Sequence, residues 1–437
     1  MFKLRPALVI ALSFLAVIAA GAVVLCLPIS SSSGTFTNFL DAYFTANSAT
    51  CVTGLVTLDT GTHFSFFGQL VILLLIQIGG LGYMTFSTYM VLLFRRKMFI
   101  TEKLTVQQAL NVYSSRDVLG VLKKIFGIVF AIEGLGAAVL FLRWLPELGL
   151  FKAVWYGIFH SVSAFCNAGF ALTSGFSSLS AYKTDVVINL TVTTLVIIGG
   201  LGFLVLADII QRRKFSLHSK LVIGTTFFLL AVGTALLFGI EYFNSRTIGG
   251  MGLWNKLLVS YFNSVTARTA GFNTLPMGNL FDSSILVILS LMFIGASPGG
   301  TGGGIKTSTF TLICSTIWAT LRNQKNTILF ERKIPAETVR RAFVIFFLSV
   351  SAIALGIFLL NGTESFSLTA MTFEVFSAFG TVGLSMGITP FLSNLGKIII
   401  IVVMFIGRLG ALSLLLALAT REGKHHISYP KEGISIG

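Results

Sequence analysis

The chain has 437 residues, of which 54% are hydrophobic and 11% are charged, and its formal net charge is +15. Soluble domains carry about 25% charged residues, so this composition excludes an ordinary soluble protein. The basic charge alone would also suit a nucleic-acid-binding protein, but several apolar runs of about 20 residues predict membrane helices instead. Four scattered cysteines in apolar segments form no CxxC pair and indicate no disulfide framework.

Eight apolar segments are each long enough to cross a membrane as a helix. They are residues 7–28, 68–94, 121–142, 186–210, 221–240, 284–320, 342–360 and 396–420. The first follows a basic start, as in a signal peptide, but its apolar run is too long for one and is predicted to be a membrane helix. Four mixed stretches between paired helices are too short or too polar to span and are predicted to be re-entrant. They are residues 37–55, 152–170, 255–272 and 367–384.

Lysine and arginine residues predict how these helices are oriented. They cluster after the second, fourth and sixth helices and near both ends, at residues 3–5, 95–124, 212–220, 322–341 and 421–431. Cytoplasmic loops carry an excess of Lys and Arg, so these segments and both termini are predicted to be cytoplasmic. The re-entrant stretches then enter from the outer side. The positive charge is therefore interpreted as setting the orientation in the membrane, with some contact to lipid at the membrane surface. We expect no nucleic-acid partner.

Short motifs repeat at about a quarter of the chain length. The re-entrant stretches contain SATCVTGL (48–55), SAFCNAGF (163–170), VTARTAGF (265–272) and SAFGTVGL (377–384). The helices that follow contain IGGLGYMTF (78–86), IGGLGFLVL (198–206), IGASPGGTGGG (294–304) and IGRLGALSL (406–414). Two motifs in the same order in every unit predict an all-α integral membrane protein with four tandem helix–pore loop–helix repeats around one central pore. The predicted units are residues 1–98, 99–215, 216–325 and 326–437.

Each re-entrant motif has one glycine at the same position, and the fourth contains Thr381-Val382-Gly383. These three residues match the first half of TVGYG, whose backbone carbonyls replace the hydration shell of a potassium ion. Glycine permits the backbone conformations that point carbonyls at an axis, and the short helix before it adds a negative dipole end. One glycine per loop, where TVGYG has two, indicates a less stringent filter. The alternative is that the glycines only allow close helix packing.

These motifs resemble the Trk/Ktr/HKT superfamily of potassium-translocating subunits over nearly the whole chain, and most of all the bacterial Ktr membrane subunits. The most specific matches are TCVTGL, NAGF, RTAGF and FGTVGL. In plant relatives that prefer sodium, serine typically replaces the first filter glycine, so Gly54 favours potassium. The resemblance implies a selectivity filter that binds K⁺ through backbone carbonyls. Its residues would be Thr50, Cys51, Val52, Thr53 and Gly54; Phe165, Cys166, Asn167, Ala168 and Gly169; Ala267, Arg268, Thr269, Ala270 and Gly271; and Phe379, Gly380, Thr381, Val382 and Gly383.

Arg408 is an isolated charge inside an apolar helix, where it needs oxygen partners or water. The stretch GASPGGTGGG (295–304) cannot readily continue a helix, and its free carbonyls are candidate partners. By the resemblance, loop and arginine form a gate below the filter; the alternative is a static arginine bonded to loop carbonyls. Pro298 and the extra glycines depart from many relatives. The predicted gate residues are Gly295, Ser297, Pro298, Gly299, Gly300, Thr301, Gly302, Gly303, Gly304, Lys306 and Arg408.

Other polar residues give weaker signals. GGTGGGIKT lacks the G-K-[ST] of a phosphate-binding loop. Asp41 and Glu374 lie in re-entrant stretches, where they would attract cations or pin the short helices. Glu133 in a spanning helix is predicted to make a structural hydrogen bond, and His160 is a candidate for tuning conduction. No histidine shows metal-site spacing and no catalytic constellation stands out, so an enzyme is not expected.

The sequence and the resemblance together predict the potassium-translocating pore of a Ktr-type uptake system in the bacterial plasma membrane. A symporter that couples potassium to sodium or protons is the alternative, and a receptor or scaffold without flux is a third class. The resemblance implies a homodimer and a cytosolic nucleotide-binding RCK ring, with ATP or ADP on that ring and a possible sodium dependence. Loops 95–124 and 322–341 would contact the ring, and the tail HHISYPKEGISIG (425–437) would pack at the dimer interface.

Overall fold

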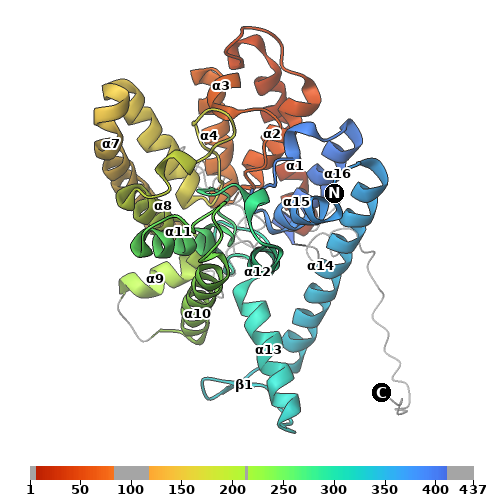
Figure 1. Ribbon diagram of the computed structural model, residues 1–437. Coiled ribbons are helices and arrows are strands. Elements are labelled where there is room, and N and C mark those ends of the chain that lie inside the picture. Colours follow the sequence, from red (N-terminus) through yellow and green to blue (C-terminus); the bar gives the residue numbers. More distant parts are fainter. Residues whose placement is uncertain (1–5, 83–117, 212–214, 411–437) are drawn as a thin grey trace, which may run out of the picture.

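The computed structural model describes residues 6–82, 118–211 and 215–410. Figure 1 shows its helices as four groups that follow one another in chain order around a centre of loops. The first group contains α1 (Pro6–Cys26), α2 (Phe39–Thr50), α3 (Thr60–His63) and α4 (Phe66–Leu81), with a 3₁₀ turn at Pro28–Ser30. The second contains α7 (Val118–Phe165), a 3₁₀ turn at Ser180–Tyr182, α8 (Val186–Leu201) and α9 (Phe203–Gln211).

The other two groups repeat the same plan. The third contains α10 (Leu217–Glu241), α11 (Leu253–Thr266), a 3₁₀ turn at Met277–Asn279, α12 (Asp282–Phe293) and α13 (Thr307–Leu321). The fourth contains α14 (Ala336–Thr363), α15 (Leu368–Gly380), a 3₁₀ turn at Thr389–Phe391 and α16 (Asn394–Leu409). In the described part of the chain the named strands are β1 (Ile328–Leu329) and β2 (Arg332–Lys333), an antiparallel hairpin between α13 and α14. The predicted all-helical fold with four helix–short helix–helix units is confirmed.

In each group a short helix lies between two limbs, and in the third group the second limb is divided into α12 and α13. In the second group the long limb and the short one belong to one helix, α7, which breaks at Gly149. There φ is 73° and ψ is 170°, a conformation that residues with a side chain rarely adopt. Asn38 and Ser367 begin two of the short helices, where their side chains accept hydrogen bonds from the N–H groups of Leu40 and Ala370. The predicted re-entrant stretches thus form short helices, two of which are capped by a side chain.

The four groups close into a ring. The limb after the short helix touches the short-helix element of the next group: α4 against α7, α8 against α11, α12 against α15, and α16 against α2. The last pair joins the fourth group to the first. The short helices therefore surround one central axis, as expected for four units around a pore.

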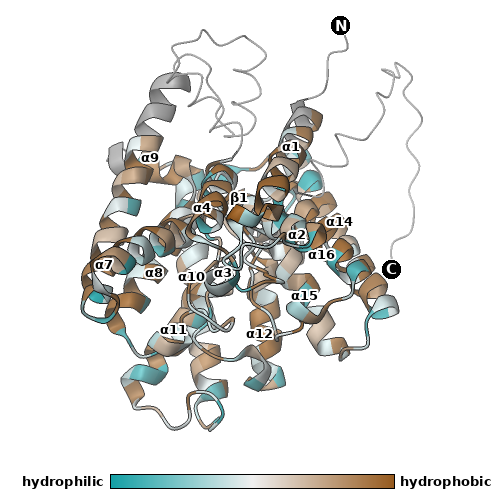
Figure 2. Cartoon of the chain, turned by 90° about the horizontal axis from the view of Figure 1, so that it is seen from above, coloured by the Kyte–Doolittle hydropathy of each residue, from teal (hydrophilic) through white to brown (hydrophobic). Residues whose placement is uncertain are grey.

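The outside of the ring is apolar, and the helices are coloured mainly brown in Figure 2. Large side chains on α10 and α14 point outward, with Phe228 62% exposed and Phe347 71% exposed. Exposed apolar surface of this extent suits contact with lipid rather than water. Three described segments are long and apolar enough to span a membrane: Phe126–Phe165, Leu217–Glu241 and Ala336–Thr363.

The predicted spanning segment 186–210 is divided into two helices, α8 and α9, which together are apolar enough to span a membrane. The chain bends by 101° between α8 and α9, at Gly202, where φ is 93°. Equivalent glycines end α4 and α16, because Gly82 and Gly410 have φ values of 78° and 82°. The predicted helices 68–94 and 396–420 are helical to Leu81 and Leu409, and residues 83–94 and 411–420 lie outside the described residues. The predicted interruption of 284–320 is present, since α12 ends at Phe293 and α13 begins at Thr307.

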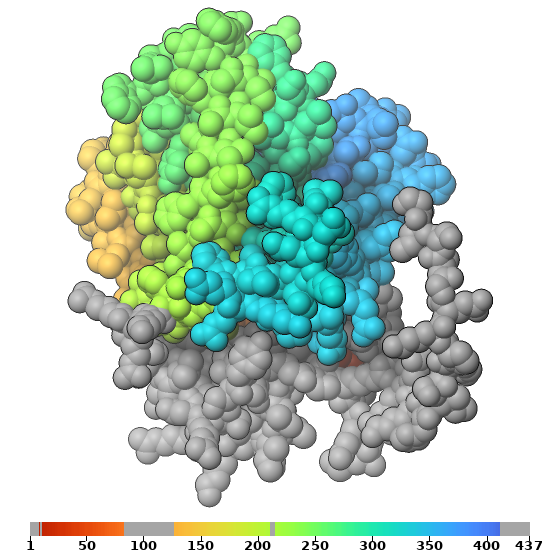
Figure 3. Space-filling model, turned by 90° about the horizontal axis from the view of Figure 1, so that it is seen from below, coloured from red at the N-terminus to blue at the C-terminus, as the bar shows by residue number. Residues whose placement is uncertain are grey.

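Figure 3 shows α13 and the hairpin, in cyan, standing forward on the face seen from below, with α10 beside them. This region contains the predicted partner loop 322–341. Arg322 stacks over the Trp318 ring at 4.7 Å, and the charged residues of the hairpin are largely exposed. Of the other predicted contact segments, residues 95–117 and the tail 425–437 lie outside the described residues.

Candidate ion pathway

The candidate filter segments are residues 50–54, 165–169, 267–271 and 379–383, and each directly follows a short helix or forms its last residues. A serine or threonine of that helix holds each turn. Ser48 and Ser377 accept hydrogen bonds from the N–H groups of Gly54 and Gly383 at 3.1 and 3.0 Å. In the other two units the hydroxyl donates instead to a carbonyl just beyond the glycine. These bonds run from Ser163 to Phe170 at 2.8 Å and from Thr266 to Phe272 at 2.5 Å.

Backbone conformation repeats in the four segments. The last glycine of each candidate filter segment, called the filter glycine below, and the residue two positions before it both have positive φ, with one residue between them. The values are 57° and 93° for Val52 and Gly54, 59° and 70° for Asn167 and Gly169, 67° and 78° for Thr269 and Gly271, and 49° and 93° for Thr381 and Gly383. The first left-handed residue lies at the end of the short helix and turns the backbone out of it, and the glycine two positions later turns the backbone a second time.

The four glycines meet one another around the axis. A Cβ atom on Gly54 would lie 3.2 Å from the Cα of Gly169, and one on Gly169 would lie 2.8 Å from the Cα of Gly271. A Cβ on Gly271 would lie 3.3 Å from Gly383, and one on Gly383 would lie 2.9 Å from Gly54. The contacts follow chain order and close on themselves. No side chain fits at these four positions without displacing backbone of the neighbouring unit.

A second set of glycines supports the segments from behind. Gly79, Gly199 and Gly407 are the first glycines of the repeated IG motifs. Each packs directly on a backbone carbonyl four residues before a filter glycine, namely that of Thr50, Phe165 or Phe379. The sequence shows these glycines as a repeated landmark, but only their packing reveals this role. Close packing, which is the alternative role considered for the repeated glycines, is thus present at this set.

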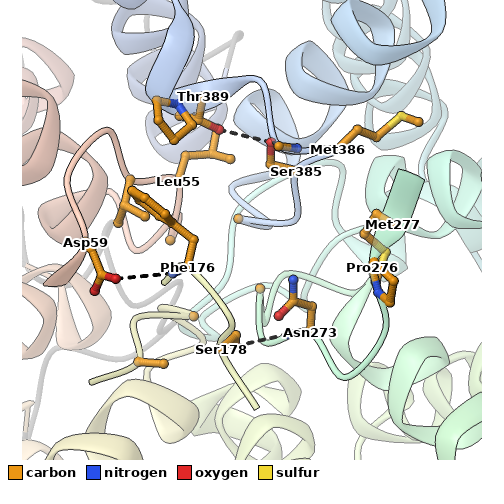
Figure 4. Close-up of a pocket in the computed structure, with 18 of the residues that line it drawn as sticks. Leu55, Asp59, Phe176, Ser178, Asn273, Pro276, Met277, Ser385, Met386 and Thr389 are labelled. Carbon is orange, nitrogen blue, oxygen red and sulfur yellow. Dashed lines mark hydrogen bonds between the residues drawn. The ribbon is translucent and has the colours of Figure 1, made fainter. Parts of the chain in front are cut away.

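A cavity of about 490 Å³ opens on one side of the four segments and is called the vestibule below. Its floor includes the four filter glycines, and its walls come from the loops that follow them in all four units. Figure 4 shows Phe176 and Leu55 on one side and Asn273 and Pro276 on another. The predicted filter segments thus lie at the base of one common cavity.

On the other side of the segments lies the glycine-rich loop between α12 and α13. Its backbone closes on itself, because the Gly295 N–H donates to the Ile305 carbonyl at 2.9 Å. The Gly303 N–H donates to the Thr381 hydroxyl at 2.9 Å, and the Thr301 hydroxyl donates to the Phe165 carbonyl at 3.2 Å. The loop is therefore bonded directly to two candidate filter segments.

Two positively charged side chains donate hydrogen bonds to backbone carbonyls in this region. Arg408, in the last turn of α16, donates to the carbonyls of Thr301 in the loop and Gly79 in α4. The Lys306 ammonium donates to the Gly302 carbonyl at 2.7 Å. In the aligned IG motifs, Arg408 occupies the position that is a second glycine in the first two units. The predicted gate residues therefore lie together, with both the loop and the arginine next to the candidate filter segments.

One predicted filter residue points elsewhere. The Arg268 side chain is 8% exposed and donates to the Gly295 carbonyl at 3.4 Å. This carbonyl belongs to the first residue of the glycine-rich loop. Within the described residues, the Arg268 Nε has no hydrogen-bond partner. Arg268 thus supplies backbone to the segment, while its side chain braces the loop behind it.

The remaining acids make specific contacts. Asp41 forms an ion pair with Lys397 of α16 at 2.7 Å, which fits the predicted pinning of its helix. Glu374 accepts hydrogen bonds from the hydroxyls of Ser385, at 2.8 Å, and Thr389. Glu133 accepts from the Gln77 amide at 3.1 and 3.2 Å. No group of three His, Cys, Asp or Glu side chains suited to a metal ion occurs in the part of the chain that the structure describes.

Comparisons with known proteins place the chain in a family. A family model described as TrkH, a cation transport protein, matches residues 6–426. The chain is 43% identical to the Ktr system potassium uptake protein B of Bacillus subtilis, over 100% of this chain and 97% of that protein. It is 39% identical to the protein of the same name from Vibrio alginolyticus, over 98% of this chain and 94% of that protein.

A further relative is the potassium/sodium uptake protein NtpJ of Enterococcus hirae, which is 37% identical over 100% of this chain and 98% of that protein. The crystal structure of the potassium transporter TrkH from Vibrio parahaemolyticus superposes with a TM-score of 0.76 at 18% identity, over 96% of this chain and 86% of that one. This similarity shows a shared fold. The family match and the full-length relatives together show that this chain belongs to the TrkH family of cation transport proteins.

Proposed function

We propose that this chain is the potassium-translocating pore subunit of a Ktr-type uptake system. The observation that carries the proposal is the closed ring of four filter glycines at the base of the vestibule. Four non-helical segments around one axis would supply rings of backbone carbonyls, which can replace the hydration shell of a cation. Potassium then enters down the membrane potential, which favours each charge by about 2.3 kcal/mol per 100 mV.

The proposed gate is the glycine-rich loop with Arg408. The loop lies against the filter segments on the side away from the vestibule, where it would close the path of an ion. A cation bonded to its Thr301 carbonyl both anchors the loop and repels a passing potassium ion. Opening requires that the arginine release this carbonyl or that the loop move with it.

The test is uptake of rubidium, as a stand-in for potassium, and of sodium into potassium-loaded liposomes that contain the purified protein. We expect passive uptake that prefers rubidium, and Gly54→Ser should shift it toward sodium. A Cβ at Gly54 would lie 2.5 Å from the Ala168 carbonyl oxygen, so the ring must widen or distort. Gly34→Ser is the matched control, because Gly34 has φ of 68° with nothing within 4 Å of a Cβ. Equal rubidium and sodium uptake by the unaltered protein would contradict the proposal.

A symporter is the second candidate, because NtpJ carries both potassium and sodium in its name. Its coupled cycle would need a sodium or proton gradient, whereas a pore would not. Rubidium uptake that starts only when such a gradient is imposed would favour the symporter. Uptake that follows the rubidium gradient alone favours the pore.

The proposed assembly is a homodimer that carries a cytosolic RCK ring, with nucleotide bound to the ring. The names of two relatives refer to a Ktr system, which supports a partner. We place the protein in the bacterial plasma membrane with both termini cytoplasmic, and assign the four units to residues 1–98, 99–215, 216–325 and 326–437. Co-purification with the ring protein, with and without ATP or ADP, tests the partner.

A further inference from the structure

The lining of the vestibule is largely apolar. Phe176 and Phe391 line it from the second and fourth units, and Met277 and Met386 line it from the third and fourth. Phe176 is 46% exposed and Phe391 is 75% exposed, so both rings offer surface to a ligand. A volume of about 490 Å³ lies within the range of small-molecule sites, roughly 300–1,000 Å³.

The charge of the vestibule favours a cation. Among its lining residues, all of which the structure describes, Asp59 is the charged one. The candidate filter at its floor is built for cations, and no lysine or arginine lines the wall. A small hydrated ion gains little from phenylalanine and methionine, whereas an organic cation with an apolar surface contacts both the rings and the carboxylate.

The aromatic walls are held in place by two acids. The Asp59 carboxylate accepts hydrogen bonds from the N–H groups of Gly175 and, at 3.2 Å, Phe176, across two units (Figure 4). Phe176 thereby keeps a positive φ of 54°, which is costly for a residue with a side chain. Glu374, fully buried, holds Ser385 and Thr389 in the loop that also carries Met386 and Phe391. The walls are therefore built before any ligand arrives.

We propose that the vestibule is a binding site for quaternary ammonium cations, which sit over the four filter glycines and obstruct the entrance. The positive charge faces the filter and the Asp59 carboxylate, while the alkyl groups contact Phe176, Phe391 and the two methionines. Cation–π contact of this kind is the established way in which proteins recognise alkylated ammonium ions. The inference rests on the proposed function only for its effect on ion flux, since binding itself requires no transport.

The probe is tetraethylammonium chloride, measured in two ways. The first is the rise in unfolding temperature of the purified protein with probe concentration, which reports binding without flux. The second is rubidium uptake by liposomes with the probe added outside. Both are repeated with Phe176→Ala, Phe391→Ala and Asp59→Asn. The matched control is Phe36→Ala, because Phe36 is 73% exposed and does not line the vestibule.

Tetraethylammonium is expected to stabilise the protein and to slow rubidium uptake over the same concentration range. Each Phe→Ala variant should need about two- to fivefold more probe, which corresponds to the loss of one exposed cation–π contact. Tetramethylammonium, which reaches less of the wall, should need more probe in every case. Phe36→Ala should behave as the unaltered protein.

Two results would overturn the inference. One is normal rubidium uptake with neither stabilisation nor inhibition by the probe. The other is an effect of the probe that is identical in both Phe→Ala variants and the control, because binding then occurs elsewhere. If rubidium uptake is absent but stabilisation occurs and weakens in the Phe→Ala variants, the site stands and the proposed transport function fails.

Discussion

Arg408 shows how a single residue differentiates the four units. The IG motifs of the first two units continue with a second glycine, whereas the fourth continues with this arginine. Gly80 packs against the Cys166 side chain, while Arg408 extends to the Thr301 and Gly79 carbonyls. The sequence marks Arg408 as an isolated charge and the glycine-rich loop as a partner. Gly79, the second partner, could not be predicted because it lies in another unit.

The first residue-scale prediction concerns the proposed gate. Arg408→Gln removes the charge but keeps a hydrogen-bond donor. We expect rubidium uptake into liposomes to rise severalfold, because the cation that opposes the passing ion is gone. Arg322→Gln is the control, since Arg322 is exposed and stacks on Trp318. Unchanged uptake in Arg408→Gln would support the alternative of a static arginine.

The second residue-scale prediction concerns Glu133, which is 5% exposed and accepts from the Gln77 amide. Glu133→Ala leaves this amide without its partner and should lower the free energy of unfolding by about 1–3 kcal/mol. Glu133→Gln keeps the size of the side chain and should cost less. Thermal unfolding of the purified protein measures both, with Glu331→Ala, an exposed acid of the hairpin, as the control. Equal unfolding temperatures for Glu133→Ala and its control would contradict a structural hydrogen bond.

At the scale of elements, the breaks in helices shape the fold as much as the helices themselves do. Gly82, Gly202 and Gly410 end three of the long limbs with positive φ. Hydropathy predicted the apolar runs but not these breaks, because an apolar residue contributes equally to a straight or a bent segment. Conversely, six glycines and a proline made the interruption before α13 predictable, since no helix tolerates that composition.

The element-scale prediction concerns the pairing of α2 with α16, which joins the first and fourth units. Asp41→Asn leaves the Lys397 ammonium, 13% exposed, without its counter-charge. We expect a loss of about 1–3 kcal/mol in the free energy of unfolding. Glu337→Gln is the matched control, because its pair with Arg341 is 60–69% exposed and is worth about 0–1 kcal/mol. The unfolding temperature of each variant measures this loss. A larger loss of stability in Glu337→Gln than in Asp41→Asn would contradict a stabilising role of the Asp41–Lys397 pair.

At the scale of the whole molecule, the ring of contacts makes four similar units into one pore-like body. Its orientation remains a prediction from the basic residues. Single cysteines at Ser32 and Asn323, both exposed, test it in a background without the four native cysteines. In intact cells an impermeant maleimide should label Ser32→Cys and should reach Asn323→Cys only after lysis. The opposite pattern would place both termini outside.

Hydropathy, the positions of glycine and the repeated motifs determined the helical class, the four units and the location of the candidate filter segments. These features are local, because a helix, a turn or a membrane span depends on residues near one another in the chain. Tertiary packing decided the rest. The left-handed Val52, Asn167, Thr269 and Thr381 carry no common residue type, and the partners of Arg408, Asp41 and Asp59 lie in other units. Such contacts depend on how the units fit around the axis, and no local pattern encodes that fit.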